Sequence, residues 1–129
     1  MNKRITVYGS LLEGLGNHGI IADREKSHKL GEHILEGGFK MISMGGFPGL
    51  IPDATVNNKI FVETYEVSDE VFKHVEHLEG YPGFYGRTKI DTPFGESEVY
   101  TLPTNSSRHN DLVPEDEDGI INWKKYRGR

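Results

Sequence analysis

Short stretches of alternating apolar and polar residues recur along this chain, and this pattern is typical of half-buried β-strands. In the first stretch Ile5 and Val7 alternate with Thr6, and Gly9 ends the run. The clearest stretch, residues 59–67, is rich in β-branched and aromatic side chains. The pattern predicts strands at residues 4–8, 30–35, 39–44, 59–67, 84–91 and 97–102.

Glycine-rich turns connect these stretches. The pair Gly37-Gly38 can supply the positive φ angles of a tight turn, so residues 30–44 are predicted to form a β-hairpin. The Gly-Gly-Phe-Pro-Gly run at residues 45–49 is predicted to be a loop. Residues 92–95, Thr-Pro-Phe-Gly, form the turn between the last two predicted strands.

One segment has the periodicity of an α-helix. Ser68 can cap its first turn, and Asp69 and Glu70 suit the positive end of the helix dipole. Gly80 is a suitable stop. The apolar residues that repeat at helical spacing are Val71, Phe72, Val75 and Leu78.

The end of the chain is more polar. Residues 105–119, with the acidic run 110–118, are predicted to be a surface loop, after which residues 120–123 pack back onto the body. The basic tail at residues 124–129 is expected to be a solvated end.

Several strands, one main helix and short connections favour an α+β domain with a closed or nearly closed mixed sheet over a layered βαβ fold. The length of 129 residues suits a single domain at residues 1–129. The 16 glycines agree with many short elements joined by tight turns.

Composition narrows the classes of function. The formal charge of −5 argues against nucleic-acid binding, which needs a basic face. The chain has no cysteine, so no disulfide framework or thiolate metal site is expected, and a cytoplasmic location is the simplest. The segment before Gly9 is too short for a signal-peptide core, and no apolar run approaches membrane-spanning length, so no membrane association is expected.

Two glycine-bearing segments carry candidate chemistry. The first is Val7-Tyr8-Gly9-Ser10-Leu11, followed by a later Gly16 and Asn17, and the second is Glu79-Gly80-Tyr81-Pro82 followed by Tyr85 and Arg87. Together with the Gly-Phe-Pro loop at residues 46–48, they resemble in order and spacing the γ-glutamyl cyclotransferase and AIG2-like superfamily, in particular the γ-glutamylamine cyclotransferases. The resemblance covers nearly the whole chain.

The resemblance implies a small mixed β-barrel with flanking helices. It implies a pocket with the loop Tyr8, Gly9, Ser10 and Leu11 as its floor and Glu79 as the catalytic carboxylate. The implied reaction releases an amine or amino acid from a γ-glutamyl conjugate while the glutamyl part closes to 5-oxoproline. The partner would be a small-molecule γ-glutamyl substrate, and no cofactor or metal is implied.

The residues themselves are suited to these roles. A strand that ends at Gly9-Ser10 leaves backbone N–H groups at its mouth, which can hold a carboxylate or an oxyanion. Glu79 stands in the last helical turn among apolar neighbours, and both influences should raise its pKa. Tyr8 and Tyr85 are either hydrogen-bonding residues of the pocket or core residues with satisfied hydroxyls. Glu76, one turn before Glu79, is expected to be solvated.

Other signals compete with this hypothesis. The Gly14-x-Gly16-x-x-Gly19 pattern matches a dinucleotide fingerprint but does not directly follow a strand and open a helix. His74 and His77 have the spacing of metal ligands, yet no further ligand is indicated. A non-catalytic small-molecule or partner-binding module on the same fold is the alternative function. An interaction protein acting through the acidic run is a third. The departing amine and the oligomeric state stay open.

Overall fold

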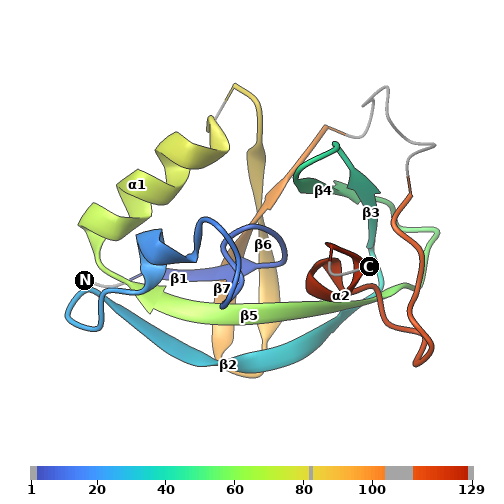
Figure 1. Ribbon diagram of the computed structural model, residues 1–129, viewed down its shortest axis with the longest axis horizontal. Helices are drawn as coiled ribbons and strands as arrows, with labels where there is room; N and C mark the ends of the chain where they lie inside the picture. The colour runs from blue at the N-terminus through green and yellow to red at the C-terminus, as the bar shows by residue number, and fades with distance from the viewer. Residues whose placement is uncertain (1–2, 82, 104–111, 128–129) are drawn as a thin grey trace.

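A five-stranded mixed sheet forms the body of the computed structural model, which describes residues 3–81, 83–103 and 112–127. The strand order is β2-β5-β1-β7-β6 (Figure 1). Its strands are β1 (Lys3–Val7), β2 (Ser27–Glu36), β5 (Lys59–Val67), β6 (Gly86–Thr92) and β7 (Gly95–Thr101). The predicted strands at residues 4–8, 59–67 and 97–102 are confirmed within one or two residues at each end.

The short strand β1 lies in the centre of this sheet. It pairs antiparallel with β5 and parallel with β7. Ile5 and Val7 point into the core, as the alternation predicted. Thr6 is also buried, and its hydroxyl forms hydrogen bonds of 2.8 Å with the hydroxyls of Thr64 and Ser97, which satisfy it in the interior.

The predicted hairpin across residues 30–44 is wrong. The chain does turn at Gly37 and Gly38, whose φ angles are 74° and 80°. However, β2 pairs with β5, and β3 (Phe39–Ser43) pairs antiparallel with β4 (Pro48–Pro52) in a separate two-stranded sheet. The glycine pair therefore moves the chain between two sheets, and the strand β4 lies partly in the run predicted to be a loop.

The α+β class and the mixed sheet are confirmed, but the expected closed barrel is not. Within the described residues, β2 and β6 are the outer strands of the five-stranded sheet. The two sheets meet where the Leu102 N–H, just after β7, donates to the Leu50 carbonyl of β4 at 2.8 Å. This contact places the β3–β4 ribbon beside one end of the larger sheet.

The predicted helix is confirmed as α1 (Asp69–Glu79). The Ser68 side chain accepts from the Val71 N–H, and Gly80 ends the helix in the left-handed conformation at φ 64°. Its buried residues, Val71, Phe72 and Val75, pack against the face of the sheet that carries Ile5, Val7, Tyr65 and Val67. The fourth apolar residue of the repeat, Leu78, is 39% exposed.

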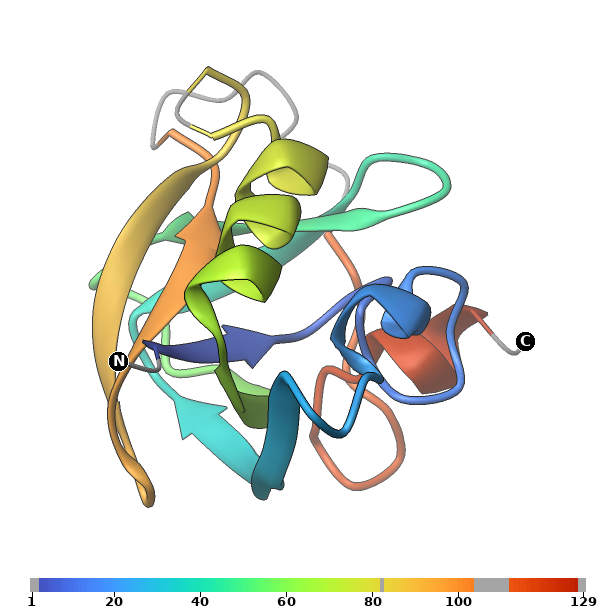
Figure 2. The same cartoon turned by 90° about the vertical axis from the view of Figure 1, so that its left-hand side faces the viewer.

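A second cluster of buried side chains joins the β3–β4 ribbon to the start of β5. The end of the chain completes it, because Ile121 and the fully buried Trp123 pack there, as predicted. Two more elements stand near the loop after β1, the 3-10 helix η1 (His18–Ile21) and α2 (Trp123–Arg127) (Figure 2). Neither α1 nor α2 is long and apolar enough to cross a membrane, among the residues described.

The acidic run and the basic tail contact each other. Lys125 lies 3.1 Å from the buried Asp116 carboxylate and 3.4 Å from the exposed Glu117. The exposed pair with Glu117 stabilises the fold only slightly. Residues 123–127 are helical, with Lys125 exposed as expected of a solvated end, whereas Tyr126 is partly covered and packs against Trp123. Residues 105–111 of the predicted surface loop lie outside the described part of the chain, and Val113 of the same segment is buried against β3.

We expect Gly49→Ala to destabilise the protein by about 1 to 3 kcal/mol, because a Cβ at Gly49 would lie 2.3 Å from a methyl group of Leu102. Urea denaturation measures the change. Gly16→Ala is the matched control, since no atom lies within 4 Å of a Cβ there. Equal stability of the two variants would contradict the close packing of β4 against the end of β7.

Candidate active site

A pocket of about 390 Å³ opens between the end of α1, the loop after β1 and the loop before β4. Its volume lies in the range of small-molecule sites. All six residues singled out from the sequence line it, namely Tyr8, Gly9, Ser10, Leu11, Glu79 and Tyr85. The other lining residues are Thr6, Val7, Asn17, Gly46, Phe47, Pro48, Leu78, Phe84 and Tyr100.

The loop after β1 presents its backbone to the pocket. Leu12 N–H donates to the Gly9 carbonyl at 3.0 Å, which folds the chain back immediately after the strand. Asn17 then closes the loop, because its N–H and its side-chain amide donate to the carbonyl and hydroxyl of Ser10 at 3.0 and 2.9 Å. The N–H groups of Ser10 and Leu11 donate to no acceptor in the described part of the chain, so they are available to a ligand.

Asn17 was not among the predicted site residues. It lies seven positions after Ser10, and only its place in the family-like motif pointed to it. Its contacts show that it sets the shape of the loop as well as lining the pocket.

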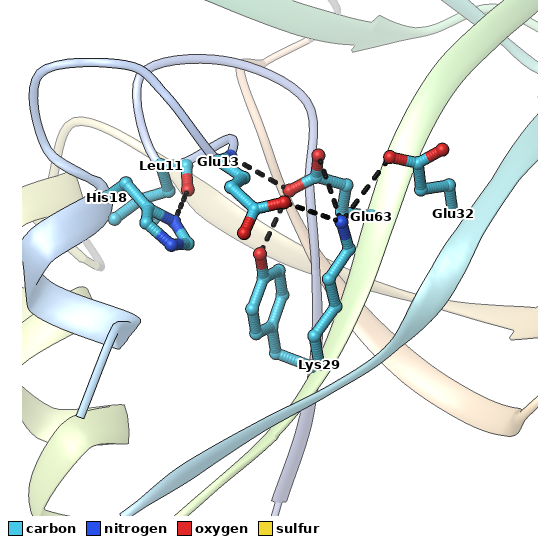
Figure 3. A network of polar contacts seen from close by, with 7 residues as sticks. Leu11, Glu13, His18, Lys29, Glu32 and Glu63 are labelled. Atoms are coloured by element: carbon cyan, nitrogen blue, oxygen red, sulfur yellow. Dashed lines mark hydrogen bonds and ion pairs between the residues drawn. The ribbon is translucent and has the colours of Figure 1, made fainter. Parts of the chain in front are cut away.

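A buried carboxylate anchors the same loop from behind (Figure 3). Glu63, in β5, has no exposed surface. One of its oxygens accepts from the Glu13 N–H and from the Tyr65 hydroxyl, both at 3.0 Å. Its other oxygen lies 3.8 Å from the Lys29 ammonium group. The negative charge is therefore held in the interior by one cation and two hydrogen bonds.

Three further contacts extend this network. The Lys29 ammonium also lies 3.1 Å from Glu13 and 3.3 Å from Glu32 (Figure 3). His18 Nδ1 lies 2.9 Å from the Leu11 carbonyl. The loop is thus fixed at Leu11 and Glu13 as well as at Ser10, which keeps its free N–H groups in place.

Gly9 is required for packing against Pro48. A Cβ on Gly9 would lie 2.6 and 2.8 Å from two carbons of the Pro48 ring. The sequence suggested instead that a glycine lets a ligand approach the main chain. The structure gives a different reason for the glycine, the close contact between two walls of the pocket.

Glu79 is the only side chain with a formal charge among the described residues that line the pocket. Burial raises its pKa from 4.5 to about 7, in the direction predicted. No side chain or N–H of the described residues donates a hydrogen bond to this carboxylate. At neutral pH, Glu79 can therefore exist in both protonation states and exchange a proton with a bound molecule.

Tyrosine hydroxyls surround Glu79 but are already engaged. Tyr8 donates to the Tyr100 carbonyl at 2.7 Å, and Tyr85 donates to the Pro48 carbonyl at 2.6 Å. Burial, first of all, raises the pKa of both hydroxyls. The two alternatives considered from the sequence, pocket residues or core residues with satisfied hydroxyls, therefore both hold in part. The two tyrosines line the pocket, and their hydroxyl groups donate to backbone carbonyls of the fold.

The expectation that Glu76 is solvated is wrong. Its carboxylate lies 3.0 Å from Arg87 Nε and accepts from the Tyr100 hydroxyl at 3.3 Å. The Arg87 guanidinium also donates to the Tyr81 hydroxyl at 2.9 Å and lies over the Tyr81 ring at 4.3 Å. Glu76 and Arg87 therefore connect α1 to β6 behind the pocket.

The remaining candidate signals have no supporting geometry. In the residues that the structure describes, no group of three or more His, Asp or Glu side chains is placed to hold a metal ion. The glycines of the Gly14-x-Gly16-x-x-Gly19 pattern lie in turns and at the start of η1, outside any strand-helix junction.

Comparison with known protein families identifies the family of this chain. The sequence profile of the family described as "Gamma-glutamyl cyclotransferase, AIG2-like" matches residues 5–125. The protein belongs to this family, as the resemblance of its motifs indicated.

Individual relatives agree. A Vibrio cholerae protein named "Putative gamma-glutamylcyclotransferase" is 27% identical over 110 residues, which cover 85% of this chain and 90% of that protein. A Methanocaldococcus jannaschii protein of the same description is 34% identical over 89 residues, which cover 67% of this chain and 68% of that protein. The crystal structure of an AIG2-like mouse protein superimposes with a TM-score of 0.70 at 22% identity, covering 94% of this chain and 95% of that one. That last likeness shows the shared fold.

We expect Glu79→Gln to stabilise the protein at high pH and to have little effect at low pH. Below pH 4.5 the carboxyl is protonated in both folded and unfolded states, so glutamine replaces a neutral group. Above about pH 7 the native state must hold a charged, partly buried carboxylate. The rise in pKa from 4.5 in the unfolded chain to about 7 in the folded protein then lowers the wild-type free energy of unfolding by roughly 3 kcal/mol, a cost that the glutamine variant does not have. Urea unfolding at pH 4.5 and pH 8 tests this, and the same change in stability at both would contradict the raised pKa.

We expect Glu63→Ala to lower the stability by about 3 kcal/mol or more, because it leaves a cavity and unpartnered donors at Glu13 and Tyr65. Glu63→Gln should cost less, since its carbonyl oxygen can accept both hydrogen bonds. Glu32→Ala, which breaks only an exposed ion pair, is the control. Hydrogen exchange at the Glu13 amide should accelerate in the alanine variant, and unchanged exchange would show that Glu63 does not hold the loop.

Proposed function

We propose that this protein is a γ-glutamyl cyclotransferase that releases an amine from a γ-glutamyl conjugate and forms 5-oxoproline. The observation that carries the proposal is a half-buried carboxyl group with a pKa of about 7, placed in the same pocket as two free backbone N–H groups. Family membership supports the class of reaction.

The substrate brings its own nucleophile in this reaction. The α-amine attacks the γ-carbonyl carbon of the same molecule, and the enzyme needs only to fold the substrate and to move protons. Glu79 first accepts a proton from the α-ammonium group, which frees the nitrogen lone pair. A carboxylate with a pKa near the working pH is suited to take up this proton and then to donate it.

Ring closure then proceeds through a tetrahedral intermediate. The new C–N bond forms, and the carbonyl oxygen becomes an oxyanion that can accept from the N–H groups of Ser10 and Leu11. The intermediate collapses as the original C–N bond breaks, and the departing nitrogen takes the proton from Glu79. The ring nitrogen still carries two hydrogens; it passes one to the Glu79 carboxylate, which hands it to the released amine, so that the products are the neutral lactam and an ammonium group. No water is consumed, and Glu79 ends in its initial state.

A binding module that uses the same pocket is the second candidate. It is favoured by the engagement of the Tyr8 and Tyr85 hydroxyls in the fold, because a binder needs shape more than it needs free acids and bases. A carboxyl group that titrates near neutral pH favours the enzyme, because a binding site for an ammonium group would use a carboxylate that stays ionised.

We expect Glu79→Gln to lower turnover by roughly 100- to 10,000-fold while the protein stays folded, because glutamine keeps the shape and loses the proton transfer. The assay follows 5-oxoproline release from γ-glutamyl methylamide and related amides. Glu25→Gln, at an exposed position away from the pocket, is the charge-matched control. Glu76→Gln is unsuitable, because Glu76 pairs with Arg87.

Isotopically labelled water distinguishes cyclisation from hydrolysis. The proposed reaction incorporates no solvent oxygen, whereas a hydrolase would release glutamate labelled at the cleaved carbonyl. Wild-type turnover in Glu79→Gln would remove Glu79 from the mechanism. Failure of the wild-type protein to release 5-oxoproline across a panel of γ-glutamyl compounds would favour the binding module.

A further inference from the structure

Three large apolar side chains stand exposed around the mouth of the pocket. Phe47 is 40% exposed, Leu78 is 39% and Phe84 is 47%. In the described part of the chain, only Leu112 is another large apolar residue with comparable exposure, and it does not line the pocket. We call Phe47, Leu78 and Phe84 the apolar rim.

The apolar rim is held by defined contacts. The Phe84 N–H donates to the Gly80 carbonyl at 2.7 Å, which fixes the turn after α1. The Phe84 ring packs edge-on against Tyr85, with centroids 4.9 Å apart, and contacts Phe47 at 6.2 Å. Leu78 continues the apolar face of α1 beyond the core. The three side chains thus come from separate segments and line the same pocket.

Charge sets a second condition on what can bind there. Among the described lining residues there is no Lys, Arg or His, and Glu79 is the only carboxylate. In the proposed reaction the Glu79 carboxylate is the partner of the substrate's α-ammonium group, and the two free N–H groups of the loop are the donors for the γ-carbonyl oxygen, so the glutamyl half uses all of them. A further charge on the departing amine would find no partner in the pocket, and the net charge of −5 would disfavour an additional anion.

We propose that the substrate is a γ-glutamyl amide of an uncharged apolar amine, with an aryl or branched alkyl group that packs against the apolar rim. This inference rests on the proposed function, because it places the glutamyl half in the pocket. It separates such amides from γ-glutamyl amino acids and peptides, whose departing part carries a carboxylate, and from lysine conjugates, which carry additional charges.

The test is calorimetric titration of the Glu79→Gln variant, in which slow turnover permits binding to be measured. Three ligands are compared: γ-glutamyl phenethylamide, γ-glutamyl methylamide and γ-glutamylphenylalanine. The first and third differ only by one carboxylate. We expect the phenethylamide to bind roughly 10- to 100-fold more tightly than the methylamide, and at least 10-fold more tightly than γ-glutamylphenylalanine.

Variants of the apolar rim locate the effect. Combining Phe47→Ala with Leu78→Ala should reduce the preference for the phenethylamide over the methylamide to within about threefold and leave methylamide binding nearly unchanged. Leu112→Ala removes an equally exposed apolar side chain outside the pocket and should preserve the preference. A preference that survives the loss of Phe47 and Leu78 would overturn the role of the rim.

Turnover by the wild-type protein separates the two proposals. Apolar preference in binding without 5-oxoproline release would contradict the proposed function and leave the apolar subsite standing. Release of 5-oxoproline from all three compounds, with γ-glutamylphenylalanine bound and turned over as well as the phenethylamide, would overturn the subsite and leave the function standing. Failure of all three compounds both to bind the Glu79→Gln variant and to yield 5-oxoproline with the wild-type protein would overturn both.

Discussion

A buried carboxylate holds the loop after β1 from behind, where Glu63 accepts from the Glu13 N–H, while Asn17 and His18 fix the loop at Ser10 and Leu11. Glu63 is the pairing partner of Val7, the last residue of β1, so the anchor and the strand that delivers the loop share one register. A slip of one residue would turn Glu63 to the other face of the sheet and remove the acceptor for the Glu13 N–H. The polar floor of the pocket is therefore set by the pairing of β1 with β5. The ion pair with Lys29 from β2 makes the retention of that charge possible.

The parts of the fold that could be predicted are those encoded by neighbouring residues. The cap at Ser68 and the stop at Gly80 define α1 locally, and the alternation around Thr6 defines β1. The false hairpin shows the limit of this reasoning. Gly37-Gly38 signals a change of direction, but it does not say that the next strand will pair with β4. That choice depends on contacts between distant segments, such as Leu50 with Leu102.

The same distinction applies to the site. Glu79 could be found because its apolar surroundings are its neighbours in sequence, and its raised pKa follows from them. The ion pair of Glu76 could not be predicted, because its partner Arg87 lies after a turn, on another element. Glu63 gave no signal, because a glutamate in a strand is usually on a solvated face. Leu78 belonged to an apolar repeat, and its place at the end of α1 takes it past the core and onto the pocket.

Several features that lower stability occur together at this end of the molecule. A carboxylate without a protein hydrogen bond, two N–H groups without acceptors and three exposed apolar side chains all border one pocket. Elsewhere in the described chain, Glu76 is paired with Arg87 and Phe72 is packed in the core, while Ser27 Oγ, Glu63 Oε2 and Arg87 Nε are buried without a hydrogen-bond partner. Only at the pocket do a carboxylate, N–H groups and apolar side chains of this kind occur together among the described residues. Their common location supports the proposed function, in which the substrate supplies an ammonium group for Glu79, an oxyanion for the loop and an apolar group for the rim.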